Sequence, residues 1–296
     1  MCLISDFMSF FEAIDVNNVK LSFVEKGSGS SVILIHGIPT DYRAWENQMK
    51  VLSKSFRAIS YSRRCAYPNQ NKDYLSSTIE NNAEDLSGLI AMKKAEPAHL
   101  IGHSYGAFVA LYFAYKHPEM VRSLVLIEPY VPSLIVENPQ NRLEILSLLF
   151  RNPSVALAAQ NFLNKSLNPA LKYVDQGDDE KAVEAFLDGV QGKPNAISQI
   201  TEPIKSMMVN NAGTIKELTS KLPHFTKKEA NAICPPTLLI SGENTPKALH
   251  AIADEVSKTI PEIQVTRIPS SAHFPHFENP EATNGAITKF LSMQNV

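Results

Sequence analysis

The sequence predicts an α/β fold in which a mostly parallel sheet is covered on both faces by helices. Short apolar runs alternate with amphipathic stretches along much of the chain. One long segment interrupts this alternation and has the pattern of several short helices. A serine between Gly102 and Gly106 joins one apolar run to the next amphipathic stretch. Strands that alternate with helices favour parallel pairing, because each helix provides the crossover that a parallel strand needs.

The predicted elements follow in chain order. Short apolar runs predict strands, and stretches with apolar residues at helical spacing predict helices. They are a strand at 31–35, a helix at 42–52, a strand at 57–61, a helix at 79–93, a strand at 98–101, a helix at 107–116, strands at 123–127 and 237–240, a helix at 247–259, a strand at 264–268 and a helix at 280–293. Before them, residues 11–16 and 19–24 flank Asn17-Asn18, a pair that accepts positive φ, and predict an antiparallel edge hairpin.

The interruption predicts two parts of the molecule. Residues 1–130 and 234–296 are expected to form the α/β core, and residues 131–233 a helical cap inserted after the sixth strand. Pro129 and Pro132 bracket the start of the insertion, and Pro235-Pro236 mark the return to the sheet.

Composition narrows the class of partner. The 296 residues carry 28 basic and 30 acidic side chains, a formal net charge of −2, so neither nucleic acid nor a membrane is expected as a partner. Cys2, Cys65 and Cys234 lack the close spacing of a zinc site or a disulfide framework. The amino-terminal residues make a poor signal peptide, and no run of 18 apolar residues occurs. These features predict a cytoplasmic protein that acts on small molecules.

The sequence Gly102-His103-Ser104-Tyr105-Gly106 is the strongest functional signal. A serine hydroxyl is a poor nucleophile unless it is held exposed and aimed at a base. A sharp turn between a strand and a helix holds it in that way, and glycines leave room where the backbone passes close to itself. The pattern predicts that Ser104 is a nucleophile.

A histidine is needed to activate this serine. His273 follows the last predicted strand and should lie on a loop at the carboxyl edge of the sheet, where open α/β sheets form their sites. His273 is therefore the predicted base. His276 is a second candidate, although packing against the preceding loop is its expected role.

Together these features resemble the α/β-hydrolase family. The resemblance covers residues 19–293 and includes H-G-x-P at 36–39, the serine turn, the insertion, and Ser271-Ala272-His273 before Asn279-Pro280-Glu281. It implies an eight-stranded sheet and an order of nucleophile, acid and histidine along the chain. It also implies an oxyanion hole from the backbone N–H groups of Ile38 and Tyr105, and a mechanism without metal or organic cofactor.

The catalytic acid departs from the family's pattern. Most relatives carry an aspartate in a segment like G-E-x-D after the seventh strand, where this chain has Thr245. Threonine cannot carry the charge that stabilises an imidazolium. Glu128, at the end of the sixth strand, occupies a place where haloalkane dehalogenases and some other relatives carry a glutamate, and it is preferred to Glu243 as the acid. Asp254, in the following helix, is less suitable.

Other departures concern the pocket. Many relatives show D-x-R-G-x-G after the fourth strand, where this chain has Arg63 and Arg64; a structural salt bridge is expected there before a role in binding polar substrate. Trp45 is predicted either to line the pocket or to pack in the core. Some apolar residues of the insertion are candidates for a ceiling over the site, although packing within the cap is expected for most of them: Phe150, Phe162, Phe186, Met207 and Met208.

The expected function is hydrolysis of small, largely apolar carboxylic esters or lactones through an acyl-enzyme. The resemblance also leaves open amide hydrolysis, carbon–carbon bond hydrolysis and perhydrolysis. Ser104 disfavours haloalkane dehalogenase and epoxide hydrolase chemistry, because relatives with those activities use an aspartate at this turn. A different class of function is a small-ligand receptor whose triad turns over slowly.

Overall fold

The computed structural model describes residues 10–138 and 141–294. Within them, one sheet holds eight strands in the spatial order β1-β2-β4-β3-β5-β6-β7-β8. The strands are β1 (Glu12–Val16), β2 (Val19–Lys26), β3 (Ser31–Ile35), β4 (Arg57–Tyr61), β5 (Ala98–His103), β6 (Val121–Ile127), β7 (Thr237–Gly242) and β8 (Gln264–Ile268). β2 pairs antiparallel with β1 and β4, and all other pairs are parallel. The predicted fold class is confirmed.

The edge hairpin forms at the predicted turn. Asn17 and Asn18 have φ values of 48° and 62°, and Val16 pairs with Val19 across the turn. Positive φ at both central residues gives the turn the twist that the two strands need.

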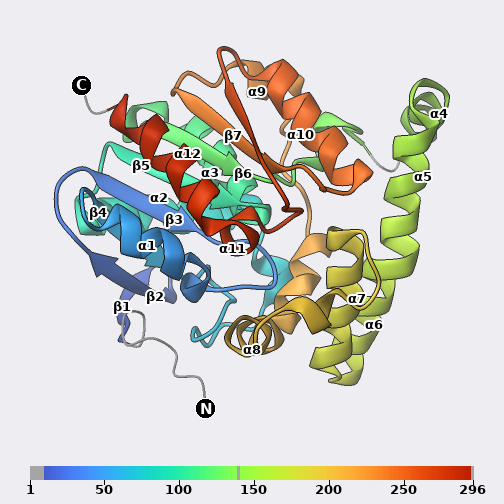
Figure 1. The fold of residues 1–296 in the computed structure, drawn as a ribbon, viewed down its shortest axis with the longest axis horizontal. Coiled ribbons are helices and arrows are strands. Elements are labelled where there is room, and N and C mark those ends of the chain that lie inside the picture. Colours follow the sequence, from blue (N-terminus) through green and yellow to red (C-terminus); the bar gives the residue numbers. More distant parts are fainter. Residues whose placement is uncertain (1–9, 139–140, 295–296) are drawn as a thin grey trace.

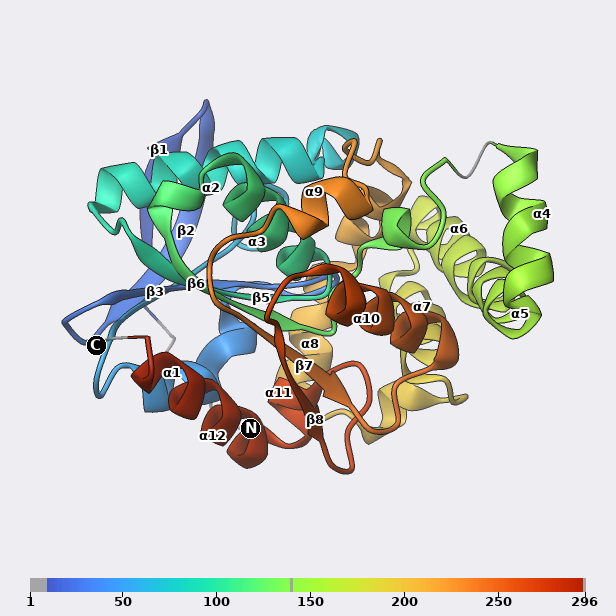
Figure 2. The ribbon, with the colours of Figure 1, turned by 90° about the horizontal axis from the view of Figure 1, so that it is seen from above.

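Helices cover both faces of the sheet, as Figure 2 shows, with α2 and α3 on one face and α1 and α12 on the other. The helices that follow the core strands are α1 (Glu46–Leu52), α2 (Ile79–Lys93), α3 (Tyr105–Lys116), α10 (Lys247–Thr259), α11 (Pro275–Glu278) and α12 (Pro280–Ser292). Leu124 and Leu126 of β6 pack in the cluster that contains α2 and α3, whereas Val125 and Ile127 pack with α1 and α12. Alternate side chains of a strand point to opposite faces, and both faces are covered here, so residues 124–127 of this strand are all apolar.

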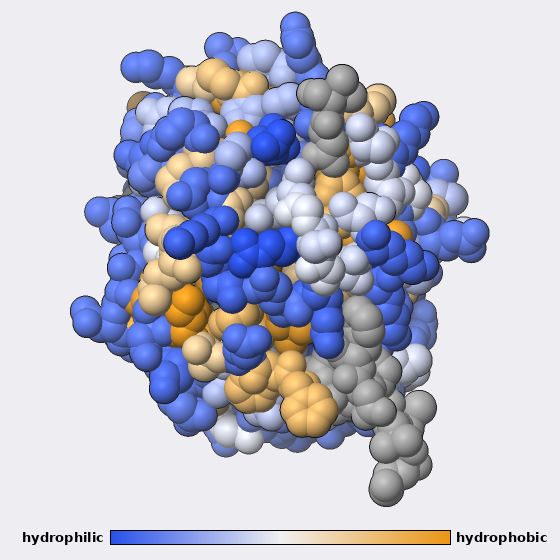
Figure 3. Space-filling model, turned by 90° about the vertical axis from the view of Figure 1, so that its left-hand side faces the viewer, coloured by the Kyte–Doolittle hydropathy of each residue, from blue (hydrophilic) through white to orange (hydrophobic). Residues whose placement is uncertain are grey.

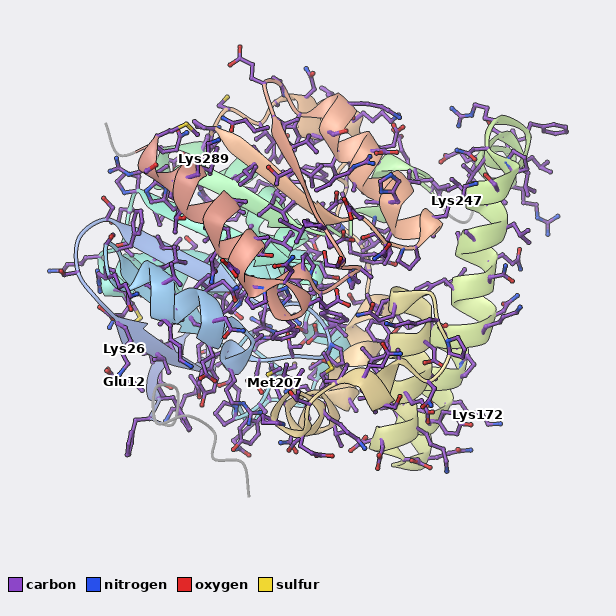
Figure 4. The ribbon with its side chains drawn as sticks, in the orientation of Figure 1. Glu12, Lys26, Lys172, Met207, Lys247 and Lys289 are labelled. Carbon is purple, nitrogen blue, oxygen red and sulfur yellow. The ribbon has the colours of Figure 1, made fainter. Side chains whose placement is uncertain are left out.

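The segment between β6 and β7 is mostly helical; its helices α4 to α8 lie to one side of the sheet, whereas α9 lies beside α10 (Figure 1). Its α-helices are α4 (Arg142–Arg151), α5 (Pro153–Phe162), α6 (Asn168–Gln176), α7 (Asp179–Gln191), α8 (Glu202–Asn210) and α9 (Lys227–Asn231). Met207, labelled in Figure 4 where α8 meets the core, packs in the same apolar cluster as Trp45 and Met49 of the core. Apolar contacts therefore join α8 to the core.

None of the helices within residues 10–138 and 141–294 is both long and apolar enough to cross a bilayer. Figure 3 shows the face that carries β1, and hydrophilic residues cover most of it.

Cys65 is buried and Cys234 is exposed, both as free thiols, whereas Cys2 lies outside the described residues.

Candidate active site

Ser104 sits on a sharp turn between β5 and α3. Its φ of 51° and ψ of −115° are unfavourable for a residue with a side chain, so the surrounding structure must hold it there. Its backbone N–H donates to the carbonyl of Ile127 at 2.9 Å, and its own carbonyl accepts from the N–H of Tyr130 at 3.2 Å. These bonds fix the turn to the end of β6.

The two glycines of the motif lie where backbones nearly touch. A Cβ on Gly102 would come 2.5 Å from the carbonyl oxygen of Gly106. A Cβ on Gly106 would come 2.3 Å from the carbonyl oxygen of Ile35 in β3. Because neither neighbour is a flexible side chain, only glycine fits at these positions.

His273 lies on the loop after β8, and its Nε2 is 3.0 Å from the Oγ of Ser104. The backbone is held on either side of His273, since the carboxylate of Glu278 accepts hydrogen bonds from the N–H groups of Ala272 at 2.8 Å and Phe274 at 3.2 Å. The carbonyl of His273 also lies 2.8 Å from Nε2 of His103. The imidazole is thus fixed through its own backbone, and sequence reasoning missed the part that Glu278 plays.

Glu128 completes the chain of side chains. Its Oε2 is 3.3 Å from Nδ1 of His273, and its residue is only 2% exposed. Its Oε1 accepts from the N–H of Gly242 at 2.7 Å and from the hydroxyl of Thr245 at 2.6 Å. Ser104, His273 and Glu128 therefore form one continuous line of contacts at the carboxyl ends of β5, β6 and β8.

The competing candidates lie elsewhere. Glu243 is exposed, and its carboxylate accepts from the N–H of Ser270 at 3.3 Å. Asp254 lies on α10, within 4 Å of the side chains of His250 and Arg267. The ring of His276 is fully buried against Trp45 and His103, with centroids 5.0 Å and 4.5 Å away.

The predicted oxyanion donors flank the serine. Tyr105 is the first residue of α3, so its N–H has no partner within the helix. Ile38 follows Gly37, whose added Cβ would come 3.1 Å from the Cβ of Ser104. This close approach brings the backbone of the 36–39 loop beside the nucleophile position.

Comparison with known proteins identifies the family of the fold. The sequence model of the alpha/beta hydrolase fold matches residues 30–280. The chain belongs to the α/β-hydrolase fold family. Among its curated relatives, 2-(acetamidomethylene)succinate hydrolase of Mesorhizobium japonicum is 26% identical over 94% of both chains. Epoxide hydrolase 3 of Xenopus tropicalis is 23% identical over 93% of this chain and 75% of its own.

Solved structures share the same hydrolase fold. Carboxylesterase CesB of Bacillus subtilis superposes with a TM-score of 0.68 at 20% identity, over 96% of this chain and 93% of its own. At this level of identity the likeness concerns the fold.

Both arginines after β4 of this α/β hydrolase form ion pairs. Arg63 is fully buried, and its Nη1 donates to the carboxylate of Glu217 in the inserted 3₁₀ helix η7 (Ala212–Thr219). Its Nε donates to the carbonyl of His36 at 3.1 Å. Arg64 donates twice to the carboxylate of Asp85, each time at 2.8 Å. Arg63 thus ties the loop that holds Ile38 to the inserted segment.

Three other histidines near the site are buried. Burial lowers the pKa of His36 and of His103 well below the ordinary value of 6.5. Burial, with a smaller contribution from the neighbouring His273, lowers the pKa of His276 to about 3. These three rings are therefore neutral at neutral pH.

The apolar candidates of the insertion divide into two groups. Phe186, Met207 and Met208 are buried, whereas Phe150 on α4 is 86% exposed. Phe162 is partly buried and packs edge-on against Phe186. Trp45 is fully buried against Met49 and other core residues. The exposure of Phe150 is inconsistent with a place in an apolar ceiling.

Proposed function

We propose that this α/β hydrolase is a serine hydrolase that cleaves carboxylic esters or lactones of small, largely apolar substrates through an acyl-enzyme. The observation that carries the proposal is the unbroken line from Ser104 through His273 to Glu128, at 3.0 Å and 3.3 Å. A hydroxyl, an imidazole and a carboxylate in this sequence are the parts that nucleophilic catalysis requires.

The chemistry follows from the atoms that meet. Oγ of Ser104 attacks the ester carbonyl while its proton passes to Nε2 of His273. The N–H groups of Ile38 and Tyr105 donate to the oxygen that becomes negative. The imidazolium then gives its proton to the leaving alkoxide, which departs and leaves an acyl group on Ser104.

Hydrolysis of the acyl group reverses these roles. Water attacks the acyl carbonyl as His273 takes its proton, and the same proton returns to Oγ as the acid is released. Throughout, Glu128 holds Nδ1–H of His273 and stabilises the positive ring. In this proposal residues 131–233 form a cap domain over a core of 1–130 and 234–296.

The substrate class rests on the nucleophile and on the charges nearby. Ser104 stands where epoxide hydrolases of this family use an aspartate to form an alkyl ester, so epoxide opening is not proposed although such enzymes are among the relatives. The charged ends of Arg63 and Arg64 are paired with Glu217 and Asp85. Small neutral esters and lactones therefore suit the site better than substrates that need a cation.

The proposal is tested with a panel of p-nitrophenyl esters and lactones. The wild type should give multiple turnovers, and Ser104→Ala should lower kcat by about four orders of magnitude or more. Ser257→Ala serves as the control, because that hydroxyl donates to a backbone carbonyl on α10. Tight binding of a substrate without turnover would instead support the alternative function, a small-ligand receptor whose triad turns over slowly.

A further inference from the structure

Thr245 lies on the loop after β7, and its hydroxyl contacts the carboxylate of Glu128. The two oxygens of that carboxylate have different partners. Oε1 accepts hydrogen bonds from the hydroxyl of Thr245 at 2.6 Å and from the N–H of Gly242 at 2.7 Å. Oε2 lies 3.3 Å from Nδ1 of His273.

This contact is not a local capping bond of the kind that threonines often make. Thr245 precedes α10, but the N-cap of that helix is Pro246 and no side chain caps it. The bond instead joins residues 117 positions apart, from the loop after β7 to the end of β6. The hydroxyl therefore acts on Glu128 rather than on its own turn.

We propose that Thr245 is a positioning residue for the catalytic acid. Its hydroxyl and the N–H of Gly242 hold Oε1, and this leaves Oε2 directed at His273. The inference rests on the proposed serine hydrolase function and adds to it: the loop after β7 takes part in the triad as a hydrogen-bond donor to the acid at the end of β6.

The physical reason lies in the burial of Glu128. A carboxylate that is 2% exposed has little contact with water, so its oxygens need hydrogen-bond donors within the protein. The terminal torsion of a glutamate is broad, so a single donor fixes the plane of the carboxylate less well than two. Loss of the hydroxyl should weaken the contact between Oε2 and Nδ1, and with it the support for the imidazolium in the transition state.

The main test compares serine and alanine at position 245, which differ only in the hydroxyl. Thr245→Ser should keep kcat for a p-nitrophenyl ester within about twofold, whereas Thr245→Ala and Thr245→Val should lower kcat by about tenfold to a hundredfold. KM should change by less than about threefold, because Thr245 positions the acid rather than the substrate. Thr259→Val is the control, since that hydroxyl donates to the backbone carbonyl of Glu255 at 2.7 Å.

A double variant separates positioning from a general structural effect. In a Glu128→Gln background, Thr245→Ala should lower kcat by less than about twofold, because the residue through which it acts has already lost its charge. An undiminished effect in that background would overturn the proposal. Equal kcat values for Thr245→Ser and Thr245→Ala would overturn it as well.

The rate of fluorophosphonate labelling distinguishes failure of this inference from failure of the proposed function. If wild-type Ser104 is labelled and Thr245→Ala is labelled at the same rate, the positioning role is wrong while the serine hydrolase stands. If wild-type Ser104 is not labelled at all, the proposed function fails first. Thr245→Ala should be labelled about tenfold more slowly than Thr245→Ser.

Discussion

Glu128 has a left-handed backbone conformation, and both oxygens of its carboxylate have polar partners. Its φ is 48°, in the left-handed region that residues with side chains seldom adopt, and its N–H donates to the carbonyl of Ile240 at 2.9 Å. The side chain then contacts His273, Gly242 and Thr245. Strained residues that the surroundings hold in place are common at functional sites.

Replacing this carboxylate should identify the acid. Glu128→Gln should lower kcat by about two to four orders of magnitude, because a neutral amide cannot stabilise the imidazolium or fix its tautomer. Glu243→Gln should leave kcat within about twofold, since that side chain is exposed. A steady-state comparison with one ester measures both, and thermal unfolding checks that the two variants fold. The reverse ranking would move the acid to the loop after β7.

The turn between β5 and α3 depends on backbone contact with β3. Gly106→Ala should unfold or strongly destabilise the protein, by about 3 kcal/mol or more, because the new Cβ would lie 2.3 Å from the carbonyl oxygen of Ile35. Gly285→Ala on the exposed side of α12 is the matched control, since its Cβ would meet nothing within 4 Å. That substitution should stabilise by about 0.5–1 kcal/mol. Urea denaturation compares the two, and equal stabilities would contradict the account of the turn.

Elements with a strong local pattern were predictable from sequence, and those defined by distant partners were not. β3, β4, β8, α2 and α10 have the bounds that their apolar spacing predicts. β5 and β7 extend beyond their apolar runs because His103, Ser241 and Gly242 still pair with neighbouring strands. The predicted helix at 42–52 instead begins as a 3₁₀ turn (Tyr42–Trp45) capped by Asp41.

The same distinction holds for the site. Sequence patterns pointed to Ser104, His273 and Glu128, and the structure brings these three side chains together. The contact of Thr245 with Glu128, 117 positions away, had no local signal. The contacts of Glu278 with the backbone of the His273 loop are short-range and were overlooked. Thr245 stood out only as a departure from a family pattern, which indicated what the residue lacks and not what it contacts.

At the scale of the whole molecule, buried neutral histidines should make the fold sensitive to acid. Between about pH 3 and 6.5 the unfolded chain binds a proton at position 276 and the folded protein does not, because burial lowers the pKa of His276 from 6.5 to about 3. The free energy of unfolding should therefore fall as the pH is lowered through this range, by about 1.4 kcal/mol per pH unit for this group. His36 and His103 act in the same direction.

Substitution of His276 measures how much this histidine contributes to the pH dependence of the free energy of unfolding. His276→Phe should reduce the slope of unfolding free energy against pH by about 1.4 kcal/mol per pH unit between pH 4 and 6. Phenylalanine is suitable because both ring nitrogens of His276 lack a hydrogen-bond partner among the described residues. His224→Gln is the control, since that ring is 82% exposed. An unchanged slope in His276→Phe would show that this ring is not a source of the acid sensitivity.

The central claim is that Ser104 is an activated nucleophile. Mass spectrometry of peptides after fluorophosphonate labelling tests it most directly, because the probe reports which serine reacts. The account predicts a single adduct on the peptide that contains Ser104, absent from Ser104→Ala and blocked by an ester that the enzyme turns over. An adduct on a different serine, or none on the folded protein, would contradict it.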